Sequence, residues 1–192
     1  MSKSRNLLWA ALALPVAIQT YRYSAEGIYY GEYLHWTGIW ATYLLLATLA
    51  VTPLRLVFGA AEWMRWIGRH RRDLGVASFA YATAHAVAYV VYKADFAMIV
   101  DEALSAGMLT GWIALLLFLP LALTSNDYSV RRLKKRWKTL HRLVYVAALL
   151  TLAHWVLTAF DPTTGYFALA ILVVLLLMRV VRPVRRPPAG SS

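Results

Sequence analysis

The sequence lacks cysteine altogether, and charged residues make up only 15% of its 192 positions. Without cysteine the chain cannot form disulfides, use a thiolate nucleophile or hold an iron–sulfur cluster through sulfur ligands. A soluble domain carries about 25% charged residues, so the low charge content is typical of a membrane protein. Acidic residues are scarcest, nine against 20 lysines and arginines. None lies in the middle of an apolar segment and no H-E-x-x-H motif is present, so zinc chemistry is not favoured.

Apolar residues dominate what is present, at 60% of the chain, with a mean hydropathy of +0.54. Because a helix needs about 20 residues to cross a bilayer, the chain has room for five or six spanning helices and little else. Pro53 is expected to bend or end the second helix, and the basic stretch 64–72 is expected to be a loop. The pattern predicts an all-α integral membrane protein, a six-transmembrane-helix bundle. Five of the predicted helices are 7–18, 34–56, 74–92, 109–124 and 166–181. The fifth in chain order follows the basic run 131–138 and extends to residue 160.

The start of the chain has two interpretations. A short basic stretch followed by apolar residues 7–18 resembles a cleaved signal peptide, but no convincing small-residue cleavage site follows, so we expect a retained first helix. We expect residues 1–182 to form one transmembrane domain. Residues 183–192 are basic and rich in proline, which predicts a disordered cytoplasmic tail.

The basic residues predict the orientation of the bundle. With six helices, all of the 20 lysines and arginines except Arg22 and Lys93 fall on one side of the membrane, together with both termini. Loops rich in lysine and arginine stay in the cytoplasm. We therefore expect both termini to be cytoplasmic.

Two histidines lie deep in apolar segments. His85 follows Arg72 by 13 residues and His154 follows Arg142 by 12, which at about 1.5 Å per residue places both imidazoles roughly 18–20 Å into the membrane. Ionisable groups at this depth are costly and usually functional. Two neutral imidazoles on neighbouring helices can supply both axial ligands of a b-type haem. The alternative is that each one hydrogen-bonds to a neighbouring helix.

The other histidines are nearer the boundaries. His141 lies beside Arg142 and could ligate a second haem, or stand at a quinone or flavin site. His141 and His154 are roughly 140° apart around an ideal helix, so a bend is needed if both face the interior. We interpret His70 as a solvated member of a basic loop and His35 as an interfacial residue.

Four cations lie near the predicted inner boundary, where they could pair with haem propionates or a flavin phosphate. Contact with lipid headgroups is the alternative for each. They are Arg71, Arg72, Lys138 and Arg142.

Four motifs resemble the MsrQ (YedZ) family, haem-binding membrane subunits of a periplasmic methionine sulfoxide reductase system within the ferric-reductase-like transmembrane group. They are LLATLAVTPL at 45–54, RRDLGVASFAYATAH at 71–85, LALTS at 121–125, and KRWKTLHRLVY at 135–145 with a later histidine at 154.

The resemblance implies that His85, His141 and His154 are the haem-associated histidines, and that residues 1–182 form the ferric-reductase-like haem domain. It implies one or two haem b, with FMN in some members, in a bacterial inner membrane. The electron donor would be quinol or a cytoplasmic flavin reductase, and the acceptor the molybdopterin-containing reductase MsrP. Related oxidases carry two histidines on each of two helices, whereas this chain lacks the fourth. Two other classes stay open: a quinol-oxidising cytochrome b anchor of another periplasmic oxidoreductase, and a cofactor-free scaffold or transporter.

Overall fold

The computed structural model describes residues 3–59 and 61–181, and this part of the chain is almost entirely helical, without a β-strand. A short π-helix, η1, follows the first helix. In chain order the elements are α1 (Lys3–Tyr21), η1 (Arg22–Glu26), α2 (Tyr30–Phe58), α3 (Glu62–Lys93), α4 (Phe96–Ala103), α5 (Ala106–Leu123), α6 (Asp127–Leu133), α7 (Lys135–His141), α8 (Leu143–Thr158) and α9 (Thr163–Val181).

Five segments of the described chain are long and apolar enough to cross a membrane: α2, α3, α5, the α7–α8 segment Lys135–Thr158, and α9. The predicted all-α membrane architecture is therefore confirmed. α1 is not among the five; its 19 residues include Lys3, Arg5 and Gln19. A sixth span and two cytoplasmic termini remain predictions, as do the domain bounds. The predicted tail, 183–192, lies outside the described residues.

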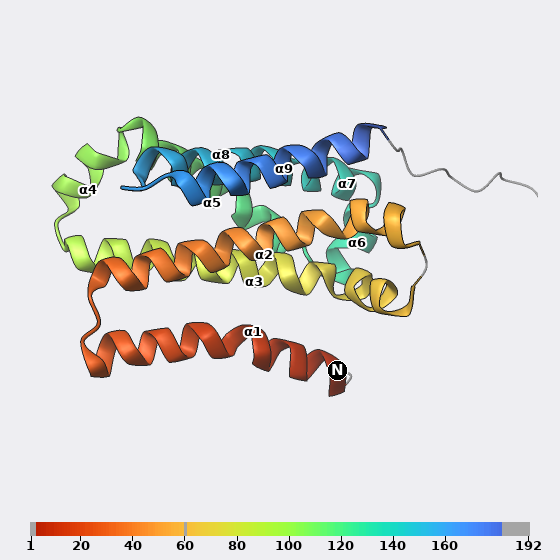
Figure 1. Cartoon of the computed structure of the whole chain (residues 1–192), viewed down its shortest axis with the longest axis horizontal. Helices are drawn as coiled ribbons and strands as arrows, with labels where there is room; N and C mark the ends of the chain where they lie inside the picture. The colour runs from red at the N-terminus through yellow and green to blue at the C-terminus, as the bar shows by residue number, and fades with distance from the viewer. Residues whose placement is uncertain (1–2, 60, 182–192) are drawn as a thin grey trace, which may run out of the picture.

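The long helices run side by side (Figure 1). α2 and α3 form an antiparallel pair, α5 packs on α8, α9 packs on α8 and α2, and α1 lies along α3. The start of α1, the end of α2, the start of α3, α6, α7 and the end of α9 share one end of the bundle, while η1, α4 and the α8–α9 turn share the other (Figure 1). We call the first the inner end, because it carries the basic run 131–138, and the second the outer end.

The core lies where α2, α5, α8 and α9 meet. Leu49, Leu172, Ala147 and Ala148 are fully buried there. The two alanines let α8 approach its neighbours closely, which is how membrane helices gain packing energy. Many large apolar side chains, by contrast, cover the outside of the bundle. A surface of this kind is suited to lipid rather than to water.

Two predicted boundaries were wrong. The basic stretch 64–72 is not a loop: α3 begins at Glu62 and runs through it as one helix of 32 residues. This stretch contains no proline, and most of its residues form helices readily. Pro53 does not end α2: the helix spans Tyr30–Phe58 instead of the predicted 34–56, and Gly59, which follows it, has a left-handed φ of 61°. Proline removes one helix hydrogen bond without necessarily ending the helix.

The basic approach to the fifth span is also divided. Lys134, with φ 48° and ψ −118°, separates α6 from α7. α7 ends at His141 and α8 begins at Leu143. Arg142, between them, keeps right-handed helical angles of φ −69° and ψ −22°, so the bend that would let His141 and His154 both face the interior stays a prediction.

Candidate functional site

His85 on α3 and His154 on α8 face each other inside the bundle. Their ring centroids lie 6.2 Å apart and the ring planes are nearly perpendicular, at 89°. Both helices run from the inner end toward the outer end (Figure 1), and His85 and His154, which follow Arg72 and Arg142 by 13 and 12 residues, meet between them. The pair joins α3, which packs on α2, to α8, which packs on α5.

Each ring is held by one nitrogen. Nδ1 of His85 lies 2.9 Å from the carbonyl oxygen of Leu34, and Nδ1 of His154 lies 2.9 Å from that of Gly107. Because a carbonyl only accepts, each Nδ1 carries the proton and donates it. Within the described part of the chain neither Nε2 has a hydrogen bond, so these are the nitrogens with a free lone pair. A backbone bond at Nδ1 is the usual way in which a metal-ligating histidine is oriented.

Glycines make room for both rings. A Cβ added at Gly111 of α5 would lie 2.7 Å from Nδ1 of His154, and one added at Gly38 of α2 would lie 3.2 Å from Nδ1 of His85. Such approaches are shorter than a normal van der Waals contact of about 3.5 Å. Any larger residue at either position would push the imidazole out of its place.

Beside Gly111, the indole of Trp112 has a buried Nε1 without a hydrogen-bond partner among the described residues. Leaving a buried donor unpaired costs about 1–3 kcal/mol. Its ring contacts Tyr89, whose hydroxyl is already bonded to Glu102. The unpaired N–H therefore offers a donor to a group that the protein itself does not supply.

His141 lies in a different place, at the inner end. Its Nε2 is 3.0 Å from Oγ1 of Thr124, and its ring stacks on Trp137 at 3.9 Å. Since the hydroxyl of Thr124 donates its proton to Pro120, Nε2 of His141 must donate to Thr124, which leaves Nδ1 with the lone pair. In the described chain no contact joins His141 to His85 or His154.

A cavity of about 230 Å³ opens beside His141. Its walls come from α2, α3, α5, α7 and α8. Four cations line it, together with aromatic and hydroxyl side chains: Arg71, Arg72, Lys138, Arg142, Trp137, Tyr145 and Ser125. The cavity thus combines apolar walls with an excess of positive charge and one imidazole.

The four predicted cations have different partners. Nε of Arg71 donates to the carbonyl of Thr48 at 3.0 Å. Arg72 forms an ion pair with Asp127 of α6 at 2.6 Å, and this hydrogen bond holds the pKa of the Asp127 carboxyl below its usual range. Lys138 and Arg142 line the cavity. Arg71 is thus oriented by the backbone and Arg72 is already neutralised.

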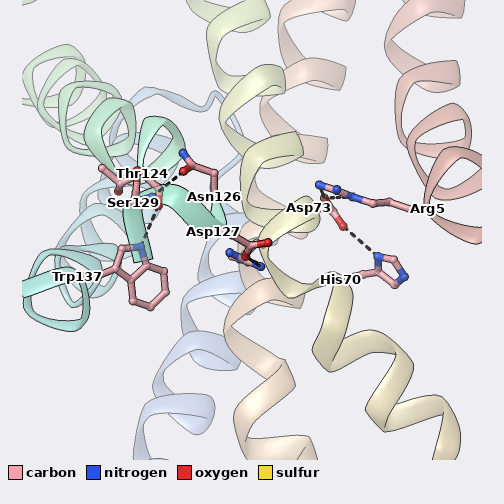
Figure 2. A network of polar contacts seen from close by, with 9 residues as sticks. Arg5, His70, Asp73, Thr124, Asn126, Asp127, Ser129 and Trp137 are labelled. Carbon is pink, nitrogen blue, oxygen red and sulfur yellow. Dashed lines mark hydrogen bonds and ion pairs between the residues drawn. The ribbon is translucent and has the colours of Figure 1, made fainter. Parts of the chain in front are cut away.

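The interpretation of His70 as a solvated loop residue was wrong. His70 lies within α3, is 8% exposed, and its Nδ1 is 2.9 Å from Oδ2 of Asp73 (Figure 2). The other oxygen of Asp73 accepts from Arg5 at 2.8 Å and from Nε1 of Trp9 at 3.2 Å. α1 is thereby tied to α3 by a buried polar network. His35 is exposed near the outer end of α2, as an interfacial histidine would be.

Sequence reasoning missed Gly38, Gly111, Trp112 and Asp73. The glycines have a weak signal, since a glycine inside a long apolar helix marks a close approach of another group. His70 and Asp73 are three residues apart, the spacing at which helical side chains meet. Nothing in the sequence marks the unpaired nitrogen of Trp112.

Comparison with known proteins gives the family. A family model described as the ferric reductase like transmembrane component matches residues 37–152. A protein of Brucella anthropi named protein-methionine-sulfoxide reductase heme-binding subunit MsrQ is 37% identical over 185 residues, 92% of this chain and 81% of its own length. The chain belongs to the MsrQ family. The predicted resemblance is confirmed.

Two further MsrQ-family relatives bear the same name. That of Brucella ovis is 38% identical over 156 residues, covering 79% of this chain and 69% of its own length. That of Rhizobium meliloti is 42% identical over 130 residues, covering 66% of this chain, and this chain spans 58% of the length of that relative. The family match runs from α2 into α8 and includes His85 and His141. His154 lies two residues beyond its end.

Proposed function

We propose that this MsrQ-family chain is a b-type cytochrome that relays electrons across a membrane, and that His85 and His154 would hold one haem. The observation that carries the proposal is the pair of imidazoles 6.2 Å apart with both Nδ1 atoms bonded to carbonyls. The free Nε2 of each ring is the ligating nitrogen. When bound, haem iron supplies one-electron chemistry by cycling between the ferric and ferrous states.

The residues around the pair fit a haem. Gly38 and Gly111 keep the space beside the rings free of side chains. The buried N–H of Trp112 is available to an acceptor on the cofactor.

The cavity beside His141 is proposed to hold a second cofactor, either another haem b or FMN. Its four cations suit propionates or a phosphate, because arginine and lysine bind such groups through charge-assisted hydrogen bonds. His141 would offer Nδ1 as a ligand, since its Nε2 is bonded to Thr124. No second histidine lines this cavity among the described residues, which favours FMN or a haem with a different second ligand.

The proposed route runs from the inner end to the outer end. Quinol or a cytoplasmic flavin reductase would supply electrons, and a periplasmic molybdopterin methionine sulfoxide reductase, MsrP, would receive them to repair oxidised methionines. The MsrQ names of the relatives support this assignment. The basic residues at the inner end support a bacterial inner membrane with that end in the cytoplasm.

The test is an optical spectrum of the detergent-purified protein before and after dithionite, with haem and flavin quantified per polypeptide. We expect sharp α and Soret bands of a low-spin b cytochrome. His85→Ala and His154→Ala should each remove the low-spin signal, whereas His35→Ala, at an exposed histidine, should leave it intact.

A colourless protein from haem-supplied cells would refute the proposal and favour a cofactor-free scaffold or transporter. Unchanged low-spin spectra in the His85 and His154 variants would refute the pairing alone. The alternative of a quinol-oxidising anchor for another periplasmic oxidoreductase predicts the same spectrum but a different co-purifying partner.

A further inference from the structure

A second cavity, of about 280 Å³, lies between α1, α2 and α3 on the side of the bundle away from His141. We call it the α1 cavity. Its lining is apolar except for one side chain, His70. The other lining residues are Leu8, Ala47, Ala50, Val51, Leu54, Trp66, Ile67 and Leu74.

The histidine of the α1 cavity is oriented as a base. Asp73 holds Nδ1 of His70 at 2.9 Å, and a carboxylate only accepts, so Nδ1 carries the proton and Nε2 has the lone pair. In the described chain Nε2 has no hydrogen bond. Asp73 is held in turn by Arg5 (Figure 2) and by Nε1 of Trp9. The carboxylate therefore stays charged and can stabilise a positive charge on the imidazole.

The location of the α1 cavity connects it to the proposed electron route. Leu74 and His70 line it from α3, while Arg71, Arg72 and Gly75 of the same helix line the cavity beside His141. α2 likewise contributes Ala47 to the α1 cavity and Thr48 to the cavity beside His141. The two cavities are thus separated by a single layer of helices.

A ligand for such a site must dissolve in lipid and present a hydroxyl to a base. We propose that the α1 cavity binds a lipid-soluble hydroquinone and that His70 accepts a proton from it, with Asp73 as a positioning residue. This rests on the proposed function, because the electrons need an acceptor. The apolar walls suit the ring and its tail, and Trp66, whose ring lies 4.6 Å from that of His70, offers a flat face to the ring.

The reaction balances as follows. Oxidation of the hydroquinone to the quinone breaks two O–H bonds and releases two electrons and two protons. The electrons pass one at a time to ferric haem, the oxidant of the proposed function. The first proton goes to Nε2 of His70 and from there to water at the inner end. The second goes to water as the second electron leaves.

The experiment uses the full-length protein with its haem, and decylubiquinol as the probe. Reduction of the haem is followed by stopped-flow absorbance without oxygen. Binding of decylubiquinone is followed by quenching of tryptophan fluorescence, and Trp66→Phe identifies the part of the quenching that is due to Trp66. The variants are His70→Gln, which keeps a group able to bond to Asp73, and Ala47→Leu, which fills the α1 cavity from an exposed position of α2. Ala80→Leu, at an exposed alanine of α3 outside the cavity, is the control.

We expect His70→Gln to slow reduction of the haem by decylubiquinol at least tenfold, with little change in fluorescence quenching. Ala47→Leu should both slow the reduction and lessen the quenching. Ala80→Leu should change neither the rate of reduction nor the quenching. Dithionite should give the same reduced spectrum in the unaltered protein and in every variant. Reduction at the unaltered rate in His70→Gln, or unaltered quenching in Ala47→Leu, would overturn the inference.

Two outcomes separate this inference from the proposed function. A normal haem spectrum with no reduction by decylubiquinol in the unaltered protein would refute the hydroquinone site and leave the cytochrome in place. Absence of haem would refute the cytochrome. The fluorescence quenching in the unaltered protein and its variants would then test, independently of haem, whether the α1 cavity binds decylubiquinone.

Discussion

Gly111→Ala is the sharpest test of the histidine pair, because it adds one methyl group against a ring. The new Cβ would lie 2.7 Å from Nδ1 and 2.9 Å from Cε1 of His154. A relaxed contact is about 3.5 Å, so the ring must retreat by roughly 0.8 Å. It cannot do so freely, since Nδ1 is bonded to Gly107 at 2.9 Å.

The expected cost follows from overpacking, which typically amounts to about 1–3 kcal/mol. If that strain opposes ligation by His154, haem affinity falls roughly 5- to 150-fold, since about 1.4 kcal/mol is a tenfold change. Gly38→Ala should have a smaller effect, because its Cβ would lie 3.2 Å from His85 and a shift of a few tenths of an ångström relieves the contact.

The assay is transfer of haem to excess apomyoglobin, which measures how readily each variant loses its cofactor. We expect the fastest loss from Gly111→Ala, intermediate loss from Gly38→Ala and unchanged loss from Gly68→Ala. Gly68 is the matched control, since its added Cβ would meet only Arg55, at 3.8 Å. Equal rates for Gly111→Ala and Gly68→Ala would refute the assignment of His154 as a ligand.

Two further outcomes are expected at the ends of the bundle. The hydrogen bond from Lys93, at 2.5 Å, lowers the pKa of the Glu102 carboxyl. The pair should therefore stabilise the outer end at neutral pH and lose that effect as the pH falls through the lowered pKa. In thermal unfolding, acidification should lower the melting temperature of Glu102→Gln less than that of the unaltered protein. At the inner end, Trp137→Phe keeps a ring to stack on His141 but removes the N–H bonded to Thr124 at 2.9 Å. We expect it to weaken the second cofactor, measured as flavin or haem per polypeptide, and to leave the low-spin spectrum of the first haem unchanged.

The helices and the histidine pair could be predicted because both depend on local chain geometry. Apolar length gives a span, and a rise of about 1.5 Å per residue gives the depth of His85 and His154. Charge in the short connections likewise predicts which end of the bundle is cytoplasmic. Predictions of this kind need no knowledge of which helices touch.

The polar network of α1 could not be predicted because it depends on contacts between distant parts of the chain. Asp73 lies 68 residues from Arg5, and only the packing of α1 on α3 brings them together. In the sequence, His70 stands among arginines and therefore has the appearance of a solvated residue. Its burial follows from the helical continuation of α3, which turns His70 and Asp73 to the face that α1 covers.

Pro53 removes a hydrogen bond from α2, and a side chain of another helix replaces it. Proline has no N–H, so the carbonyl of Leu49 loses its partner within α2. Leu49 is fully buried, and an unpaired carbonyl in an apolar core is costly. Arg179 of α9 supplies the missing donor at 2.7 Å and also donates to the hydroxyl of Tyr145. A cation near the end of the last span thus compensates for a proline in the second.

This account predicts coupling between two positions far apart in the sequence. Arg179→Met alone should destabilise the protein by about 1–3 kcal/mol, because it leaves the Leu49 carbonyl unpaired. In a Pro53→Ala background the helix restores that hydrogen bond itself, so the same replacement should cost clearly less. Unfolding of all four proteins by denaturant in detergent gives the coupling energy. Additive effects within about 0.5 kcal/mol would mean that Arg179 does not act through Leu49.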